Sequence, residues 1–408
     1  MQTRLTDAIR DTAAGEEAES ILRRCVHCGF CNATCPTYIL SGNELEGPRG
    51  RIYLIKNLLE GDPVSNRTRA HLDHCLGCRA CETTCPSGVR FHRLADIGRE
   101  LIASGEQRPL WDRWRRRLIA RFFDNSLPLR FSIAVGRRLR PILPARLKRL
   151  LPSVASRWPE SEGATTVLLH DGCVQPVLAP STNLAASRVL RRRGIGSRRV
   201  SGCCGAMAYH LDELPRARRQ IRRNIDQWSP LLEDSAGLVV TASGCAAFLK
   251  DYGALCRDDP DYAERADRIA HSICDLGEFL CPLDPGPGTR PVGQVALHVP
   301  CTLKNALQGG DRLRTLLVAS GWALADSGDG DQCCGSAGAY SLLHRNTSRR
   351  LRNAKLDVLG ADSVERIVTA NIGCQMHLSA GTDVPVQHWV EVWDEIEDRI
   401  QAQGSSSH

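Results

Sequence analysis

Two runs of closely spaced cysteines are the part of this chain best suited to chemistry. In each run, cysteines stand at every third position three times, a fourth follows four positions later, and a proline comes directly after it. Thiolates at this spacing bind iron–sulfur clusters, because one tight loop can present three sulfurs to three irons of a cubane. The runs are Cys25, Cys28, Cys31, Cys35 and Pro36, and Cys75, Cys78, Cys81, Cys85 and Pro86.

The fourth iron of each cubane needs a thiolate from outside the loop. In two-cluster ferredoxins, the fourth cysteine of one run binds the cluster of the other run. Zinc also accepts thiolates at this spacing, but it closes on four ligands and gains nothing from a crossed, proline-terminated arrangement. The spacing therefore predicts two [4Fe–4S] clusters, one on Cys25, Cys28, Cys31 and Cys85, and one on Cys75, Cys78, Cys81 and Cys35.

The composition limits the class of protein. A chain of 408 residues, 42% of them hydrophobic, is long enough for two to four globular domains. Its 19 cysteines stand at metal-ligand spacing, the N-terminus shows no apolar leader, and no run of about 18 apolar residues offers a spanning helix. These features predict a cytoplasmic protein in a reducing compartment. The net charge of +7 is local and aromatic residues make up only 5%, so we expect no binding of nucleic acid.

The segments around the cysteine runs read as helices. Residues 5–24 predict a helix that leads into the first run, and residues 47–59 predict a second helix that lies across both clusters. Arg49 and Arg51 at the start of the second helix either face the anionic clusters or belong to a solvated helix start.

Residues 108–163 differ in character from the rest of the chain. Arginines crowd this segment, as in 113–117, while prolines divide it into short pieces and tryptophan, leucine and phenylalanine lie between the charges. The segment predicts a linker or docking element. Peripheral contact with an anionic inner membrane is the alternative, because basic residues interleaved with apolar ones suit a lipid surface.

A second repeat fills the remainder of the chain. Leu168–Cys173 matches Ala296–Cys301, Cys203–Gly205 matches Cys333–Gly335, and Thr241–Cys245 matches Thr369–Cys374. In each copy, apolar β-branched runs alternate with helical stretches, which predicts a parallel sheet with cysteines just beyond its strand ends. Each copy thus offers a candidate metal site: Cys173, Cys203, Cys204 and Cys245 in the first, and Cys301, Cys333, Cys334 and Cys374 in the second.

These motifs together resemble the cysteine-rich (CCG) family, which includes subunits of heterodisulfide reductase, anaerobic glycerol-3-phosphate dehydrogenase and glycolate oxidase. The resemblance is strongest to the glycolate oxidase iron–sulfur subunits and spans nearly the whole chain. It implies an α+β fold in which a ferredoxin-like helical domain precedes two duplicated α/β CCG half-domains. We expect the boundaries at 1–107 for the two-cluster domain, 108–163 for the linker, 164–286 for the first half-domain and 287–400 for the second.

One departure from the family concerns the end of each CCG unit. Relatives of heterodisulfide reductase close the unit with Cys-x-x-Cys, which gives a fifth thiol. Here Phe248 and His377 stand at the closing positions. The first unit therefore lacks a fifth ligand, whereas His377 could supply an imidazole to the second, so if only one half binds metal we expect it to be the second.

The resemblance implies an electron-transfer subunit of a glycolate dehydrogenase complex that oxidises glycolate to glyoxylate. No Gly-x-Gly-x-x-Gly follows a predicted strand, so we expect the flavin and the substrate site on a flavoprotein partner. A quinone or another membrane acceptor would take the electrons. The alternatives are the iron–sulfur subunit of a D-lactate or glycerol-3-phosphate dehydrogenase, or a CCG protein that itself reduces a disulfide or a quinone.

Overall fold

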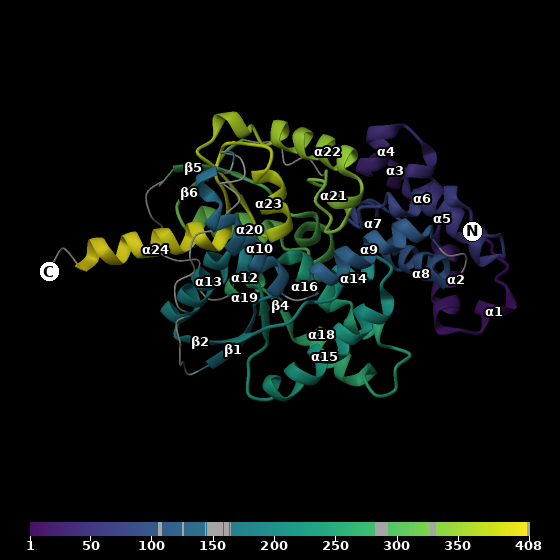
Figure 1. Ribbon diagram of the computed structural model, residues 1–408, viewed down its shortest axis with the longest axis horizontal. Helices are drawn as coiled ribbons and strands as arrows, with labels where there is room; N and C mark the ends of the chain where they lie inside the picture. Colours follow the sequence, from purple (N-terminus) through teal and green to yellow (C-terminus); the bar gives the residue numbers. More distant parts are fainter. Residues whose placement is uncertain are drawn as a thin grey trace.

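A computed structural model describes residues 1–104, 108–124, 126–142, 144, 158, 163, 165–281, 293–326 and 332–405. An N-terminal helical module stands at one end of the long axis, and two α/β units fill the rest, with the two chain termini far apart (Figure 1). The predicted α+β fold, with a helical two-cluster module followed by two repeated units, is confirmed.

Short helices connected by tight loops build the N-terminal module. Ile21, Leu22, Ile55 and Leu94 form the middle of its apolar core, and each is at most 2% exposed. The helix predicted over 47–59 is present as Pro48–Leu59, with Gly47 as its N-cap. The helix predicted over 5–24 is divided, because Thr12 caps a new helix by accepting a hydrogen bond from the Gly15 N–H. The helices are α1 Asp7–Arg10, α2 Ala13–Arg24, α3 Phe30–Ala33, α4 Pro36–Ser41, α5 Pro48–Leu59, α6 Asn66–Asp73, α7 Ala80–Thr83 and α8 Phe91–Ser104.

Each CCG half contains a parallel sheet of four strands in the same order. The first sheet runs β2-β1-β3-β4 and the second β6-β5-β7-β8, so the duplication read from the sequence extends to topology. The middle strands are buried on both faces, as parallel strands covered by helices must be. The strands are β1 Thr165–His170, β2 Ile195–Val200, β3 Leu238–Val240, β4 Ile273–Asp275, β5 Gly293–Leu297, β6 Trp322–Leu324, β7 Arg366–Thr369 and β8 Val386–His388.

Helices surround both sheets and join the two halves. Residues from both sheets share one large core, and α13 packs along α24, where Arg188 and Arg192 pair with Asp394. In the first half the helices are α12 Gln175–Leu178, α13 Pro180–Arg192, α14 Ala206–His210, α15 Leu214–Leu232, α16 Ser243–Lys250, α17 Tyr252–Leu255, α18 Ala263–Ser272 and α19 Leu276–Leu280. In the second they are α20 Gly310–Ala319, α21 Tyr340–Leu343, α22 Arg345–Val358, α23 Ile372–Ser379 and α24 Trp389–Ser405.

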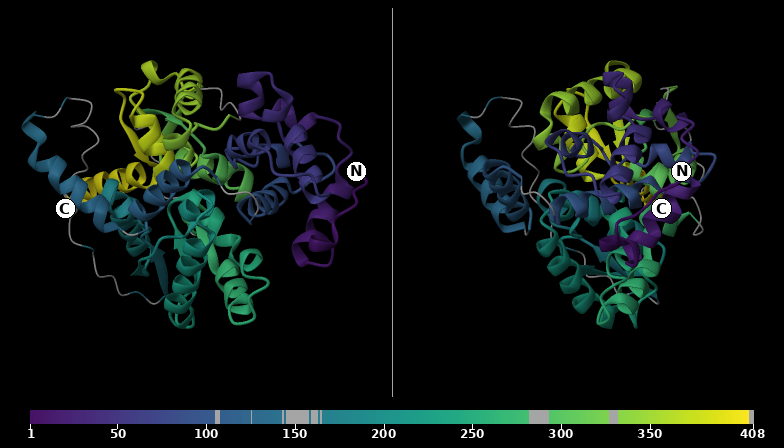
Figure 2. Two further views of the ribbon diagram at one scale, coloured as in Figure 1. Left: turned by 45° about the vertical axis from the view of Figure 1, so that its right-hand side comes forward. Right: turned by 90° about the vertical axis from the view of Figure 1, so that its right-hand side faces the viewer.

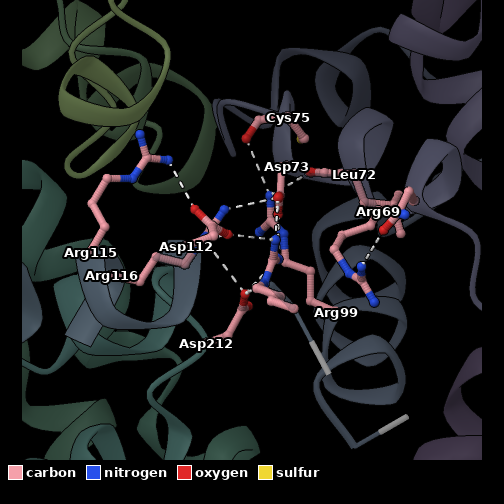
Figure 3. A network of polar contacts seen from close by, with 11 residues as sticks. Arg69, Leu72, Asp73, Cys75, Arg99, Asp112, Arg115, Arg116 and Asp212 are labelled. Atoms are coloured by element: carbon pink, nitrogen blue, oxygen red, sulfur yellow. Dashed lines mark hydrogen bonds and ion pairs between the residues drawn. The ribbon is translucent and has the colours of Figure 1, made fainter. Parts of the chain in front are cut away.

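The basic segment begins with two helices, α9 Leu110–Phe122 and α10 Ser126–Arg138, and much of the remainder up to residue 163 lies outside the described residues. Helix α9 is bound tightly by ion pairs (Figure 3). Arg108 contacts both Asp73 of the N-terminal module, at 2.6 Å, and Asp212 of the first CCG half, also at 2.6 Å. Arg116, only 4% exposed, bonds the same Asp73 at 2.9 Å. The start of the linker thus connects two units rigidly, while α10 lies at the edge of the molecule (Figure 2).

Candidate metal centres

The two ferredoxin-type loops follow the same unusual backbone path. The second and fourth residues after the first cysteine of each run have positive φ: His27 at 60° and Gly29 at 88°, and Gly77 at 64° and Arg79 at 58°. Residues other than glycine rarely adopt this conformation. Its recurrence at matching positions shows that each loop curls in the same way, so that three sulfurs turn toward one point.

Two cavities separate the eight thiols into two sets. A cavity of about 30 Å³ is lined by the first trio together with the fourth cysteine of the second run, that is, Cys25, Cys28, Cys31 and Cys85. A neighbouring cavity of about 100 Å³ is lined by the other trio and the fourth cysteine of the first run, that is, Cys75, Cys78, Cys81 and Cys35. Cys81 lines both cavities, so the two spaces adjoin.

The thiol pKa values follow the same grouping. Burial raises the pKa of Cys25, and the charges of Cys85 and Cys28 raise it further. Burial also raises the pKa of Cys81, with added contributions from Cys78, Cys75 and Cys35. Buried thiols that disfavour one another's ionisation are the donor set that a cationic metal cluster stabilises as thiolates. The residues present therefore fit two [4Fe–4S] clusters.

Arg51 lies beside the second cluster cavity and is 1% exposed. Its Nη1 donates to Cys35 Sγ at 3.9 Å, its Nη2 to Glu46 Oε2 at 2.9 Å, and its Nε to the His71 carbonyl at 2.7 Å. The sequence left open whether the arginines of this helix face the clusters or the solvent, and Arg51 faces a cluster ligand. Arg49 lines the first cavity and pairs with Glu44, its side chain 34% exposed.

The cavity around the second cluster has a polar neighbour that the sequence did not indicate. Glu46 Oε1 accepts hydrogen bonds from His71 Nδ1 at 2.7 Å and His74 Nδ1 at 2.8 Å. The three side chains lie close enough to share a metal ion, but Arg51 already occupies the other carboxylate oxygen, so the group is satisfied as a hydrogen-bonded network. His71 and His74 stand three residues apart at the end of α6, while Glu46 comes from a separate short helix at residues 44–46, and no pattern along the chain connects it to them.

In the first CCG half, the structure brings the four predicted thiols together at the carboxyl ends of β1, β2 and β3. Cys204 Sγ lies 3.6 Å from Cys245 Sγ, and Cys173 hydrogen bonds to Cys203. The glycine that follows the paired cysteines has a positive φ in both halves, 97° at Gly205 and 84° at Gly335. The left-handed turn explains why glycine completes this motif.

The second CCG half repeats this arrangement, with its four thiols in one hydrogen-bonded chain from Cys301 to Cys374. Cys301 and Cys333 form the first pair in this chain, with their sulfurs 3.9 Å apart. The charge of Cys301 raises the pKa of Cys78 of the second cluster set, and the charge of Cys78 raises the pKa of Cys333. Cys334 hydrogen bonds to both Cys333 and Cys374. The first pair therefore adjoins the ferredoxin module, where Asn305 also donates to the Cys78 carbonyl at 2.8 Å.

The residues at the two closing positions, Phe248 and His377, have different surroundings. His377 points its Nε2 toward Ser348, with Oγ at 3.1 Å and the carbonyl oxygen at 3.3 Å, and its role as a ligand stays a prediction. His298, which the sequence presents only as a histidine near a cysteine, lies within 4.8 Å of the sulfurs of Cys334 and Cys374. Burial lowers the pKa of His298 to about 3. Phe248 packs between Tyr209 and Tyr252 and lines the second cluster cavity.

Comparison with family models divides the chain in the same way as the structure. The 4Fe–4S dicluster domain matches residues 21–89, and the cysteine-rich domain matches residues 167–250 and 295–379.

Curated relatives match over most of the chain. The glycolate oxidase iron–sulfur subunit of Escherichia coli (strain K12) is 45% identical over 96% of this chain and 98% of its own length. The probable glycolate oxidase iron–sulfur subunit of Bacillus subtilis (strain 168) is 30% identical over 90% of both chains. Lactate utilization protein A of Geobacillus thermodenitrificans (strain NG80-2) is 27% identical, over 55% of this chain.

A solved structure shares the fold. The crystal structure of a hypothetical protein from Helicobacter pylori superposes with a TM-score of 0.51 at 10% identity, and the match covers 95% of this chain and 72% of that one. At this identity the likeness concerns the arrangement of elements alone.

Proposed function

This chain belongs to the family of glycolate oxidase iron–sulfur subunits, and we propose that it carries electrons away from a flavoprotein partner that oxidises glycolate to glyoxylate. Two [4Fe–4S] clusters, when bound, accept and release electrons one at a time. The observation that carries the proposal is the pair of adjoining cavities lined by the crossed cysteine sets.

We expect electrons to reach the chain at the first cluster. Cys28 is exposed, and Val26 and Phe30 beside it are 69% and 62% exposed, so this side of the first cavity opens to the surface. Exposed apolar residues around a redox centre suit a protein partner, since docking would bury them and bring the two centres close. The flavin and the glycolate site then belong to that partner.

The second cluster occupies the interior position of the relay. Its cavity is lined by residues of both CCG halves as well as of the N-terminal module, including Tyr209 and Phe248 of the first half and Thr302 of the second. Arg51 supplies positive charge next to Cys35 and stabilises electron density on that side of the cavity. On the far side lies the Cys301–Cys333 pair, so the second CCG half is the one placed to communicate with the relay, and it is the half we propose to hold metal.

The acceptor is proposed to be a quinone or another oxidant at a membrane surface. Within the described residues, no helix is long and apolar enough to cross a bilayer. Helices α9 and α10 nevertheless expose large apolar side chains next to arginines: Leu110 80%, Trp111 69%, Trp114 54%, Leu118 51%, Leu127 68% and Phe131 72%. Tryptophan and phenylalanine between basic residues suit the headgroup region of anionic lipid.

The proposal is tested by purifying the chain without oxygen together with the proteins that accompany it. We expect about eight irons per chain from two [4Fe–4S] clusters, a co-purifying flavoprotein, and reduction of both clusters, seen by electron paramagnetic resonance, when glycolate is added. Adding D-lactate in place of glycolate tests the alternative substrate, which the similarity to lactate utilization protein A supports. The proposed function is refuted if neither substrate reduces the clusters in a complex that retains its flavin.

A further inference from the structure

An open cavity of about 650 Å³ lies between helix α9 and the junction of α21 and α22. This volume is in the range of sites that bind small organic molecules. The described residues that line it are basic, polar or apolar, and none of them is a carboxylate. They include Arg115 and Ile119 of α9, Leu342 and Leu343 of α21, His344 between the two helices, and Arg345 at the start of α22.

Two side chains of the cavity wall have nitrogen atoms that the described residues leave unpaired. Nε of Arg115 and Nε2 of His344 are buried, and neither has a hydrogen-bond partner in the described part of the chain. Nη2 of Arg115 donates to Asp112 at 2.9 Å, which holds the guanidinium in place. An unpaired buried polar atom costs free energy, so a ligand whose oxygens reach these nitrogens would remove that cost.

Aromatic side chains connect the cavity wall to the second cluster set. The rings of His344 and His74 pack edge to face with their centroids 4.8 Å apart, and His74 directly precedes Cys75 in the sequence. The ring of Tyr340 lies 4.7 Å from that of His344 on the same path. Burial raises the pKa of Tyr340, and the charge of Cys75 raises it further. One ring contact and one peptide link therefore separate the cavity wall from a cluster ligand.

An apolar surface begins at the edge of the cavity. Figure 3 shows Arg115 reaching from α9 toward the yellow-green chain of the second CCG half. Trp111 lies one helical turn before Arg115, and Leu118 directly precedes Ile119; the two apolar side chains are 69% and 51% exposed. A ligand with a polar ring and an apolar tail can therefore place its ring in the cavity and its tail along α9 or in lipid.

We propose that this cavity binds the ring of a membrane quinone. The inference rests on the proposed function, in which electrons leave the chain for an acceptor at a membrane surface. A quinone has two ring oxygens that accept hydrogen bonds from Arg115 and His344, and its long side chain is apolar. A phospholipid headgroup would also suit the arginines, but it would gain nothing from the ring contact that connects the cavity to Cys75.

The reaction at this site converts the quinone into a quinol. Two electrons and two protons are added, and an O–H bond forms at each ring oxygen. The electrons are those that the oxidation of glycolate to glyoxylate releases, and water at the open mouth of the cavity supplies the protons. The Arg115 cation stabilises the negative charge that the first electron places on a ring oxygen. Burial lowers the pKa of His344 to about 4, so the imidazole is neutral near pH 7 and positions the ring as an Nε2–H donor.

The test first locates the quinone on the complex, which is purified without oxygen and kept oxidised. A photoreactive azido-benzoquinone should label peptides that contain residues 115–119 and 342–347. An excess of unlabelled short-chain benzoquinone should prevent the labelling. Because binding is measured before any electron transfer, this result does not depend on the relay.

Single substitutions then test the wall of the cavity. Arg115→Gln should weaken quinone binding by roughly 10-fold, and His344→Phe, which keeps a ring against His74, by about 2- to 10-fold. Asn346→Trp, at an exposed position of the wall, should fill the cavity and abolish binding. The matched controls are Arg117→Gln on α9 and Asn353→Trp further along α22, both exposed and outside the cavity lining. Both controls should bind quinone as the wild type does.

Three results would overturn the inference: a label that maps to other segments, an Asn346→Trp variant with full iron content that still binds quinone, or a label that glycerol phosphate blocks and unlabelled quinone does not. The last result would assign the cavity to a lipid headgroup. Failure of the proposed function would appear separately, as wild-type clusters that glycolate does not reduce although the quinone label is found at the cavity.

Discussion

Replacing Arg51 by methionine tests whether this buried arginine sets the reduction potential of the second cluster. Methionine fills a similar volume without charge, so the change removes the guanidinium next to Cys35 Sγ and leaves Glu46 with its histidine partners. Loss of a positive charge disfavours the added electron. We therefore expect the potential of the second cluster to fall.

The magnitude follows from the distance. The guanidinium nitrogen lies 3.9 Å from the Cys35 sulfur, which places the charge roughly 6 Å from the cluster when a metal–sulfur bond is added. At an effective dielectric constant of about 20, a unit charge at that distance contributes about 3 kcal/mol. One electron crossing 100 mV corresponds to about 2.3 kcal/mol, so the fall should be on the order of 100 mV.

A redox titration followed by electron paramagnetic resonance measures the two clusters separately. Arg51→Lys should give a smaller shift than Arg51→Met because it retains the charge. Arg49→Met is the matched control: Arg49 is one-third exposed, so solvent screens its charge and the first cluster should shift less. An unchanged or higher potential for the second cluster in Arg51→Met, with full iron content, would refute the reasoning.

Three further predictions concern ligation, pH and the membrane. Cys85→Ala should abolish the signal of the first cluster and Cys35→Ala that of the second; loss of the cluster on each variant's own run would disprove crossed ligation. Burial raises the pKa of Asp275 to about 7, so the folded state binds the carboxyl proton more tightly than the unfolded state does. The stabilisation from this protonation is lost as the pH rises through 7. Asp275→Asn should therefore raise the melting temperature, relative to wild type, more at pH 8 than at pH 5, and equal differences would contradict this. Trp111→Ser with Phe131→Ser should reduce flotation with anionic vesicles several-fold, whereas unchanged flotation would assign this surface to another partner.

The sequence predicts best where the structural constraint is local. The cysteine runs and the helix predicted over 47–59 depend on spacing along a few turns of chain, and the structure has this helix at Pro48–Leu59. The division of the helix predicted over 5–24 also had a local signal, since Thr12 is a strong capping residue. The repeated sheets followed from the repeated motifs.

Contacts between residues that are far apart in the sequence could not be predicted from local spacing. His377 stands three residues beyond Cys374 in α23, which makes it a possible ligand in addition to the four cysteines, and the fold adds a hydrogen bond to Ser348 of α22 that spacing could not predict. His298 reaches Cys374 because β5 and β7 are neighbours in the sheet, a pairing that spacing along the chain does not reveal. The same holds for Arg116, which the sequence presents as one of several surface arginines and the fold buries against Asp73.

The shared walls of the second cluster cavity have a consequence for how the protein matures. These walls come from the N-terminal module and from both CCG halves, and Arg79, which lines the cavity, bonds Asp251 across the boundary. We therefore expect the cluster to be inserted most readily while the N-terminal module is still undocked, with the duplicated halves packing against the filled site afterwards.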